Sequence, residues 1–267
     1  MNKNSDLIIV IPYFNDPVGI KTSIDSITEE INIDIIIVDD GSKTKFHEED
    51  IKSCYTKGEI HFVYLQENLG IEHALNKGLK TAQDLKYKYI ARLDCGDKCK
   101  PNKFKKQLDY LNQNPDVKLL GTWVNVVDEQ GNHLHYIKHP VSYVEIKKKM
   151  YLNSMFVHPS VIFSTSIIDS VGYYPVNYKA AEDYAFFFKI IKKFKAENYP
   201  EVLLDYELNE NSISSTKRKI QVQNRIKIIK KHFYFGITPI YGILRNYILL
   251  YVSREGATKI KKLLNKS

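Results

Sequence analysis

The sequence predicts an α/β fold, in which helices flank a mainly parallel sheet and a helical extension follows at the C-terminus. Short, continuous apolar runs, typical of strands buried on both faces, alternate with longer segments whose apolar residues recur at helical spacing. Such alternation is typical of right-handed βαβ units. We place the α/β domain at residues 1–215 and the extension at residues 216–267.

The first two strands and helices are predicted in the order that a parallel sheet requires. Leu7–Ile11 is the first strand, and Pro12 ends it because proline cannot donate to a strand ladder. Isoleucines at helical spacing predict a helix over Ile20–Ile31, and the apolar run Ile33–Val38 predicts the second strand. A charged helix is predicted near Phe46–Tyr55.

Two more strand and helix pairs follow. Ile60–Leu65 is the third predicted strand, and the spacing of small and apolar residues predicts a helix over Ile71–Leu85. The fourth strand, Tyr89–Leu93, runs into an acidic turn. Pro101 suits the first position of the next helix, since proline's fixed φ and missing N–H cost nothing there, and that helix should end before Pro115.

The rest of the domain has a different character. Lys118–Val127 and Leu134–Lys138 flank a polar turn with a glycine, which predicts a β-hairpin. The other predicted elements are a helix, a short strand, an apolar helix and a last strand: Val144–Leu152, Ser160–Phe163, Glu182–Phe194 and Glu201–Leu208.

The extension is basic first and apolar afterwards. From Thr216 to Lys231 the chain is rich in Lys and Arg and predicted to be helical, and Ile237–Val252 is apolar with three tyrosines. This pattern favours contact with an anionic membrane surface. The alternative is an ordinary helical appendage with a solvated basic face. Nucleic acid is not an expected partner, because the basic run lacks interleaved aromatic residues.

The composition indicates in which cellular compartment the protein is expected. The chain has 267 residues, 43% of them hydrophobic, a formal net charge of +8 and only three cysteines. An odd number of cysteines without framework spacing favours a reducing compartment. No apolar run reaches the ~20 residues of a membrane-spanning helix, and the N-terminus does not resemble a signal peptide. We therefore expect a cytoplasmic protein, or one bound peripherally to the inner face of the cell membrane.

Polar residues follow three of the predicted strands, where each strand ends. Asp39–Ser42 follows the second strand, Asn68–Gly70 the third, and Asp94 and Asp97 the fourth. Ligands of open α/β sheets bind beyond the carboxyl ends of the strands. Carboxylates there can bind ribose, a base or Mg²⁺ and Mn²⁺ ions, and a helix N-terminus can face a phosphate. The alternative for each turn is a simple helix cap, but three on one edge favour a ligand site.

Six segments from Leu7 to about Ile191 match one known family, in the family's order. They read IIVIPYFND, IIIVDDGS, ENLGIEHALNKGL, YIARLDCGDKCKPNKFKKQ, HPSVIF and AEDYAFFFKI. The sequence thereby resembles the inverting family 2 glycosyltransferases of the Rossmann-like GT-A fold, of the bacterial type that builds surface polysaccharides. The six segments together are highly specific, whereas VDDGS alone is only moderately so.

The resemblance implies a site for a UDP-sugar and a divalent metal ion. It implies that Asp39, and with it Asp40, binds the uracil and ribose, and that Asp94 and Asp97 hold the diphosphate with Mn²⁺ or Mg²⁺. The full nucleotide-sugar site implied is Pro12, Tyr13, Asn15, Asp39, Asp40, Asn68, Gly70 and Asp94.

The acidic turn departs from the family pattern at one position. The family's turn usually reads Asp-x-Asp-Asp, and Gly96 stands at its third position here. The first and last carboxylates remain, so a metal is expected on Asp97, with Asp94 on the ribose or on metal-bound water. Which of the two ligates the metal directly stays open.

Glu182 and Asp183 match the family's Glu-Asp pair, in which the aspartate is the catalytic base. Inverting transfer needs a base opposite the leaving diphosphate, placed to take the proton of the acceptor hydroxyl. The alternative is a pair of acids that only favours a helix N-terminus. His158 belongs to a matching His-Pro-Ser segment, and it is expected either to line the acceptor pocket or to be structural.

Three other histidines, His133, His135 and His139, lie on or near the predicted hairpin. No carboxylate or cysteine joins them at ligand spacing. We therefore expect them on an exposed hairpin surface rather than at a metal.

Together these observations predict a metal-dependent inverting glycosyltransferase. It would move a hexose or N-acetylhexosamine from a UDP-sugar to a glycan or lipid-linked acceptor, in the synthesis of cell-surface polysaccharide or lipopolysaccharide. Because of Gly96, the alternative is a catalytically weak homologue that binds nucleotide sugars and serves a partner transferase. A nucleotidyltransferase is disfavoured, since Ile11–Asp16 has neither a Gly-rich phosphate loop nor a basic residue.

Overall fold

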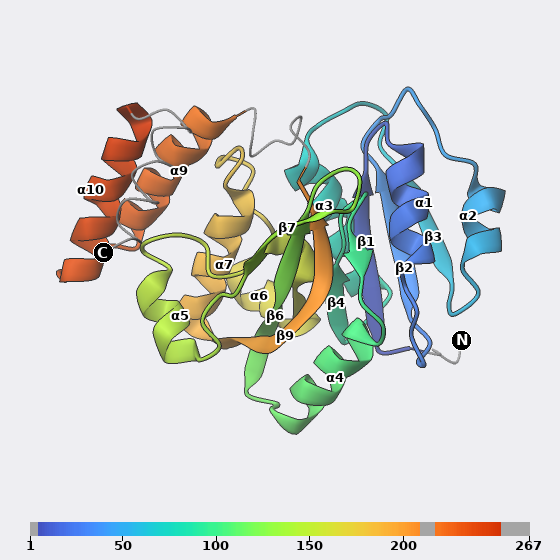
Figure 1. The fold of residues 1–267 in the computed structure, drawn as a ribbon, viewed down its shortest axis with the longest axis horizontal. Helices are drawn as coiled ribbons and strands as arrows, with labels where there is room; N and C mark the ends of the chain where they lie inside the picture. Colours follow the sequence, from blue (N-terminus) through green and yellow to red (C-terminus); the bar gives the residue numbers. More distant parts are fainter. Residues whose placement is uncertain (1–4, 209–216, 252–267) are drawn as a thin grey trace.

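The computed structural model describes residues 5–208 and 217–251. The described chain folds around one nine-stranded sheet with helices on both faces (Figure 1). The strand order is β3-β2-β1-β4-β8-β6-β9-β5, and β7 pairs with β6 outside this path. The predicted α/β fold is therefore confirmed.

One half of the sheet is parallel, as the apolar runs predict. Its strands are β1 (Leu7–Tyr13), β2 (Asp34–Asp39), β3 (Ile60–Tyr64) and β4 (Tyr89–Arg92). β1 pairs in parallel with β2 and β4, and β2 pairs in parallel with β3. The loops that follow these four strands therefore leave from the same edge of the sheet.

Three helices connect these strands: α1 (Pro17–Asp25), α2 (Glu48–Cys54) and α3 (Ile71–Asp84). The helix predicted over Ile20–Ile31 is too long, because α1 ends at Asp25. Ile27 is buried all the same, in the segment that leads to β2. The isoleucine spacing thus reports burial correctly beyond the end of the helix.

The other half of the sheet is mixed rather than parallel. β8 (Ile162–Ser164) pairs antiparallel with both β4 and β6 (Val117–Val127), while β9 (Lys195–Glu207) runs parallel to β6. The two-residue strand β5 (Lys98–Cys99) has no sequence signal. β9 begins six residues before the predicted strand, because pairing with β6 shifts register between Thr122 and Trp123 and so accommodates Pro200.

The predicted hairpin is present as β6 and β7 (His133–Ile137). The helix after the acidic turn is α4, which begins two residues later than Pro101. The remaining elements lie between β6 and β9 or precede β6: α4 (Lys103–Gln113), α5 (Tyr143–Lys149), η1 (His158–Ser160), η2 (Thr165–Ile167), α6 (Ile168–Val171) and α7 (Glu182–Lys193).

Two hydrophobic clusters fill the two faces of the sheet. Alternate residues of β1 enter opposite clusters, since Ile8 and Val10 pack with α3 and α7 while Ile9 and Ile11 pack with α1. This alternation follows from the period-two geometry of a strand. Burial on both faces explains why the central strands read as continuous apolar runs.

The extension packs on this body through α9 (Arg218–Lys231), which contacts α7, and α10 (Ile237–Tyr251) packs against α9 (Figure 1). Ile228 and Ile229 of α9 belong to the core cluster of α7. Gly242 lets α10 approach closely, because a Cβ there would lie 2.0 Å from the carbonyl oxygen of Tyr151. The predicted domain boundary at 215/216 lies outside the described residues. Within residues 5–208 and 217–251, no helix combines the length and apolarity needed to cross a bilayer.

Candidate functional site

A cavity of about 350 Å³ lies at the carboxyl edge of the parallel strands. The loops after β1, β2 and β4 and the N-terminus of α3 surround it, as the topological rule for open α/β sheets predicts. Six of the predicted nucleotide-sugar residues line it: Pro12, Tyr13, Asp40, Asn68, Gly70 and Asp94.

Asp40 ties two of these loops together. Its carboxylate accepts hydrogen bonds from the backbone N–H groups of Leu69 (2.9 Å) and Gly70 (3.0 Å). Gly70 can turn there because its φ is +101°, a conformation that side-chain-bearing residues rarely adopt. The cavity wall is therefore held in place before any ligand binds.

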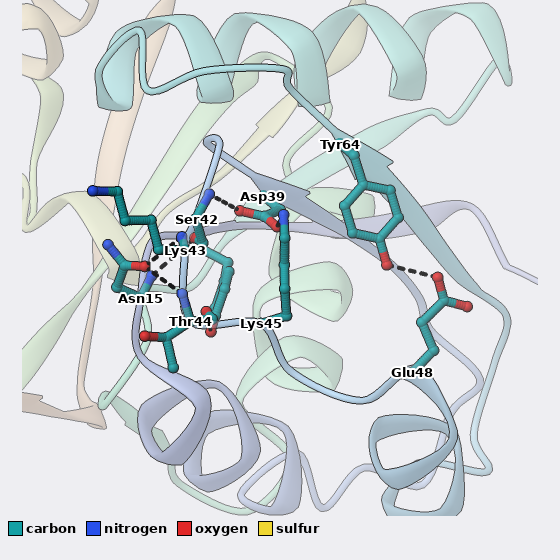
Figure 2. A network of polar contacts seen from close by, with 9 residues as sticks. Asn15, Asp39, Ser42, Lys43, Thr44, Lys45, Glu48 and Tyr64 are labelled. Carbon is teal, nitrogen blue, oxygen red and sulfur yellow. Dashed lines mark hydrogen bonds and ion pairs between the residues drawn. The ribbon is translucent and has the colours of Figure 1, made fainter.

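Asp39, the last residue of β2, is fully buried beneath the loop that follows this strand. Its carboxylate accepts hydrogen bonds from the backbone N–H of Ser42 (2.8 Å) and from Nζ of Lys45 (2.7 Å), as Figure 2 shows. Lys45 is half exposed. A nucleoside that binds Asp39, as the resemblance implies, would have to displace this lysine.

Asn15, in the loop after β1, holds the loop that follows Asp39 (Figure 2). Its side-chain oxygen accepts hydrogen bonds from the backbone N–H groups of Lys43 (2.8 Å) and Thr44 (2.9 Å), and its backbone N–H donates to Oγ of Ser42. Asn15 and Asp39 are not among the residues that line the cavity. In this structure, they support the loop instead.

In the acidic turn, Asp97 is 2% exposed and only one of its carboxylate oxygens has a partner. Oδ1 accepts a hydrogen bond from the backbone N–H of Glu207 (2.8 Å), whereas Oδ2 is buried without one. Burial, and then the nearby charge of Asp94, raises the pKa of Asp97 well above its ordinary value. An unpartnered buried carboxylate oxygen is a site where a cation would be stabilising.

Arg92, the last residue of β4, supports the candidate site through Asp94, and the sequence did not predict this. It is fully buried, and its guanidinium donates hydrogen bonds to Asp94 Oδ1 (2.5 Å) and to the backbone oxygen of Val10. This ion pair orients Asp94 at the cavity. The available signal was a single charged residue in an otherwise apolar strand, directly before the acidic turn.

His158 joins the same network from η1. Its Nε2 lies 3.3 Å from Nε of Arg92 and 2.8 Å from the hydroxyl of Tyr174. Because a guanidinium only donates, Nε2 accepts, and the ring is neutral. Burial, and then the charge of Arg92, lowers the pKa of His158 well below its ordinary value. The ring also borders the second cavity, described next.

A second cavity, of about 420 Å³, contains the predicted catalytic pair. Glu182 and Asp183, at the N-terminus of α7, line it together with His158 and Asp94. Burial, followed by the charge of Asp183, raises the pKa of Glu182 to about 8. The pKa of Asp183 is also raised by burial, while a hydrogen bond from the backbone N–H of Tyr184 and the charge of Arg225 oppose the shift.

Burial raises the pKa of both acids, so this pair holds a proton more readily than exposed carboxylates do. Neighbouring carboxyls with raised pKa values at a cavity are suited to proton transfer. Asp94 lines both cavities, so the two cavities adjoin at this residue.

Sequence reasoning missed further residues of the two cavities. Lys217 borders the first cavity, and Gln221 and Arg225 of α9 border the second. In the sequence, nothing distinguishes these three residues from the others of the basic segment Thr216–Lys231. His139 also borders the second cavity, so placing it on an exposed hairpin is wrong: β7 ends at Ile137, and burial lowers the pKa of His139 to about 4. His133 and His135 are exposed as expected.

The acidic turn fits a divalent metal ion. No group of three or more His, Cys, Asp or Glu side chains in the described part of the chain is arranged to hold a metal by itself. Mg²⁺ in phosphate sites, however, is usually bound by one or two carboxylates together with phosphates of the substrate. Asp97, through its unpartnered Oδ2, and Asp94 would supply those carboxylates.

Comparisons with known proteins agree with this geometry. Residues 8–172 match the family described as glycosyl transferase family 2. The uncharacterized glycosyltransferase MJ1057 of Methanocaldococcus jannaschii is 33% identical over 79% of this chain and 74% of its own length. A UDP-Gal:alpha-D-GlcNAc-diphosphoundecaprenol beta-1,3-galactosyltransferase of Escherichia coli is 30% identical over 76% of this chain and 71% of its own. The bifunctional glycosyltransferase pgtA of Dictyostelium discoideum is 28% identical over 80% of this chain, which spans only 34% of that protein.

Solved structures share the fold at low sequence identity. S. aureus TarS (residues 1–349) in complex with UDP-GlcNAc has a TM-score of 0.70 and 15% identity, over 96% of this chain and 75% of that one. The mannosyltransferase PcManGT from Pyrobaculum calidifontis, in complex with GDP-Man and Mn²⁺, has a TM-score of 0.66 and 15% identity. This match covers 94% of the present chain and 71% of the PcManGT chain.

Proposed function

Since the chain belongs to glycosyl transferase family 2, we propose that it is a metal-dependent, inverting transferase that uses a UDP-sugar. It moves a hexose or N-acetylhexosamine to a glycan or lipid-linked acceptor, in the synthesis of cell-surface polysaccharide or lipopolysaccharide. One observation carries the proposal: Asp94 belongs both to the cavity of the predicted nucleotide-sugar residues and to the cavity of Glu182 and Asp183.

In the proposed reaction, Asp183 takes the proton of the acceptor hydroxyl as that oxygen attacks the anomeric carbon. Attack comes from the face opposite the bond to the diphosphate, so the configuration inverts. The anomeric centre becomes oxocarbenium-like on the way, as in glycoside hydrolysis. A divalent ion on Asp97 and Asp94 would neutralise the charge that develops on the departing UDP. Glu182, next to the base, lines the same cavity and would orient Asp183 or the acceptor.

Support for the donor and acceptor classes comes from the relatives. One structure of the same fold holds UDP-GlcNAc, and the Escherichia coli relative acts on a sugar linked to diphosphoundecaprenol. Neither name belongs to this chain, so both classes are part of the proposal. The second structure holds Mn²⁺ with its nucleotide sugar, which supports a divalent cofactor.

The proposal is tested by turnover of a panel of UDP-sugars with Mn²⁺. We expect release of UDP from one donor in preference to the others, and we expect the rate to fall when EDTA is added. A protein that binds a UDP-sugar, as judged by thermal shift, but releases no UDP with any acceptor would contradict the proposal. That result would favour the alternative of a nucleotide-sugar-binding partner of another transferase.

We also propose that the extension holds the protein on an anionic membrane surface. Residues 217–251 carry eight Lys or Arg and no Asp or Glu. Basic and apolar groups adjoin, since Nζ of Lys230 lies 5.3 Å from the ring centroid of Tyr247. Phe235 and Ile237 are 96% and 88% exposed. Basic residues beside exposed apolar side chains are typical of helices that lie in a lipid interface.

Exposed residues test this better than truncation, because α9 contributes to the core. We expect Phe235→Gln combined with Ile237→Gln to weaken binding to anionic vesicles at least about tenfold, since 1.4 kcal/mol is tenfold and each buried side chain contributes about 1.5–3 kcal/mol. Val18→Gln, at a 75% exposed position of α1, is the matched control. Vesicle sedimentation measures binding, and salt should weaken it partly. Equal binding by all three proteins would refute membrane contact through this surface.

A further inference from the structure

Arg225 places the C-terminal extension at the catalytic cavity. It lies on α9, more than fifty residues beyond the part of the chain that matches the family. Its side chain nevertheless borders the same cavity as Glu182 and Asp183. Gln221, one helical turn earlier on α9, borders the cavity as well. One face of α9 therefore forms part of the cavity wall.

The guanidinium of Arg225 is incompletely hydrogen-bonded. Its Nε is buried and has no hydrogen-bond partner. Burying an incompletely paired charge is costly, so a guanidinium in this state is stabilised by a negative charge in the same cavity. The neighbouring Asn224 is used differently: its side chain donates to the backbone oxygen of Lys179 and anchors the helix. Arg225 makes no such anchoring contact among those found in the described chain.

Arg225 is a cation in the same cavity as Asp183, and each charge favours the ionised form of the other. Burial raises the pKa of Asp183, the charge of Asp94 adds to the rise, and Arg225 opposes it. Asp183, in turn, favours the charged form of Arg225. The charged and titratable groups around Asp183 and its partners Glu182 and Arg225 are Glu72 on α3, Asp94 after β4, His158 on η1, Tyr174, Tyr184 on α7, Arg218 on α9 and Arg245 on α10.

We infer that Arg225 is a positioning residue that keeps Asp183 available as a proton acceptor, so that the extension is part of the catalytic machinery. The inference rests on the proposed function, in which Asp183 is the base. It assigns to α9 a role beyond membrane contact, with Arg225 turned inward to the cavity while Lys219 and Lys230 are exposed. A cation that lines the same cavity as a base favours its ionised form.

The test is the pH dependence of sugar transfer by Arg225→Gln, with Lys219→Gln as the matched loss of one charge on the exposed side of the same helix. We expect the acid limb of kcat to move to higher pH by about one unit for Arg225→Gln, with the KM for the donor nearly unchanged. Arg225→Lys should return the acid limb of kcat close to its wild-type pH. Lys219→Gln should leave the acid limb where it is. Arg225→Met keeps the apolar stem and replaces the glutamine variant if that variant unfolds.

Two further measurements make the outcome decisive. In an Asp183→Asn background, Arg225→Gln should change the residual rate little, because Arg225 acts through Asp183. The titration of the Asp183 carboxyl, followed by carbon-13 NMR, should shift upward in Arg225→Gln whether or not a substrate is known. An unchanged titration, or a raised donor KM with an unchanged pH profile, would overturn the inference and assign Arg225 to substrate binding. A wild-type protein without turnover would count against the proposed function, while the titration would still decide the role of Arg225.

Discussion

Asp183→Asn should lower kcat for sugar transfer by about 10²–10⁴-fold, the usual loss when a general base is removed. Asparagine keeps the shape of the side chain but cannot accept the proton of the acceptor hydroxyl. Affinity for the UDP-sugar should barely change, because predicted donor contacts such as Asp40, Asn68 and Gly70 line the first cavity and not that of Asp183. Steady-state kinetics with separate donor and acceptor titrations measure both quantities.

Two further variants test whether the loss is specific to Asp183. Glu182→Gln should be milder if Glu182 only orients Asp183 or the acceptor. Asp169→Asn removes an exposed carboxylate from the first turn of α6 and should not affect transfer. If Glu182→Gln abolishes turnover while Asp183→Asn retains it, the two roles are exchanged. If both transfer sugar normally, the pair is only a helix cap and the active site lies elsewhere.

The rate should also depend on pH in a definite direction. Asp183 accepts a proton only when it is ionised, and burial raises its pKa. The rate should therefore fall as the pH drops through this raised pKa, at a higher pH than an exposed aspartate would give. The acid limb should disappear in Asp183→Asn.

Asp97→Asn should abolish most metal-dependent binding of UDP. Asp97 offers a buried carboxylate oxygen, Oδ2, that has no partner within the described part of the protein. An uncharged amide at this position cannot hold Mg²⁺ or Mn²⁺ with comparable strength. Calorimetry with UDP, in the presence of Mn²⁺ and then of EDTA, measures the loss. Asp109→Asn, an exposed change on α4, is the control.

The same substitution should leave the fold intact without metal. The side-chain oxygen of the introduced asparagine can still accept the hydrogen bond that the backbone N–H of Glu207 now donates to Oδ1 of Asp97. A buried carboxyl with a raised pKa stabilises the fold fully at pH values below its unfolded pKa, and this contribution is lost as the pH rises through the folded pKa. At neutral pH the metal-free variant should therefore be at least as stable as the wild type. UDP affinity of the wild type that does not change with EDTA would refute the metal site, and a variant that unfolds would show that Asp97 is structural.

The sequence by itself determined the parallel half of the sheet and the order of the polar loops. Strands buried on both faces must be apolar throughout, so runs such as Ile33–Val38 predict β2 whatever surrounds them. The carboxyl ends of parallel strands meet at one edge, so Asp40, Asn68 and Asp94 could be expected at one site. These predictions needed only local patterns and one rule of topology.

Only the tertiary structure decided how the site is completed. The mixed half of the sheet arises from pairing between β6, β8 and β9, which lie far apart in sequence and carry no local sign of direction. Arg92 became an orienting residue because β4 is buried, and Arg225 reached the cavity because α9 packs against α7. In the sequence, Arg225 is one cation in a basic run. Its position at the cavity that Asp183 also lines is a result of long-range packing, and long-range packing leaves no periodic signal in the residues that take part.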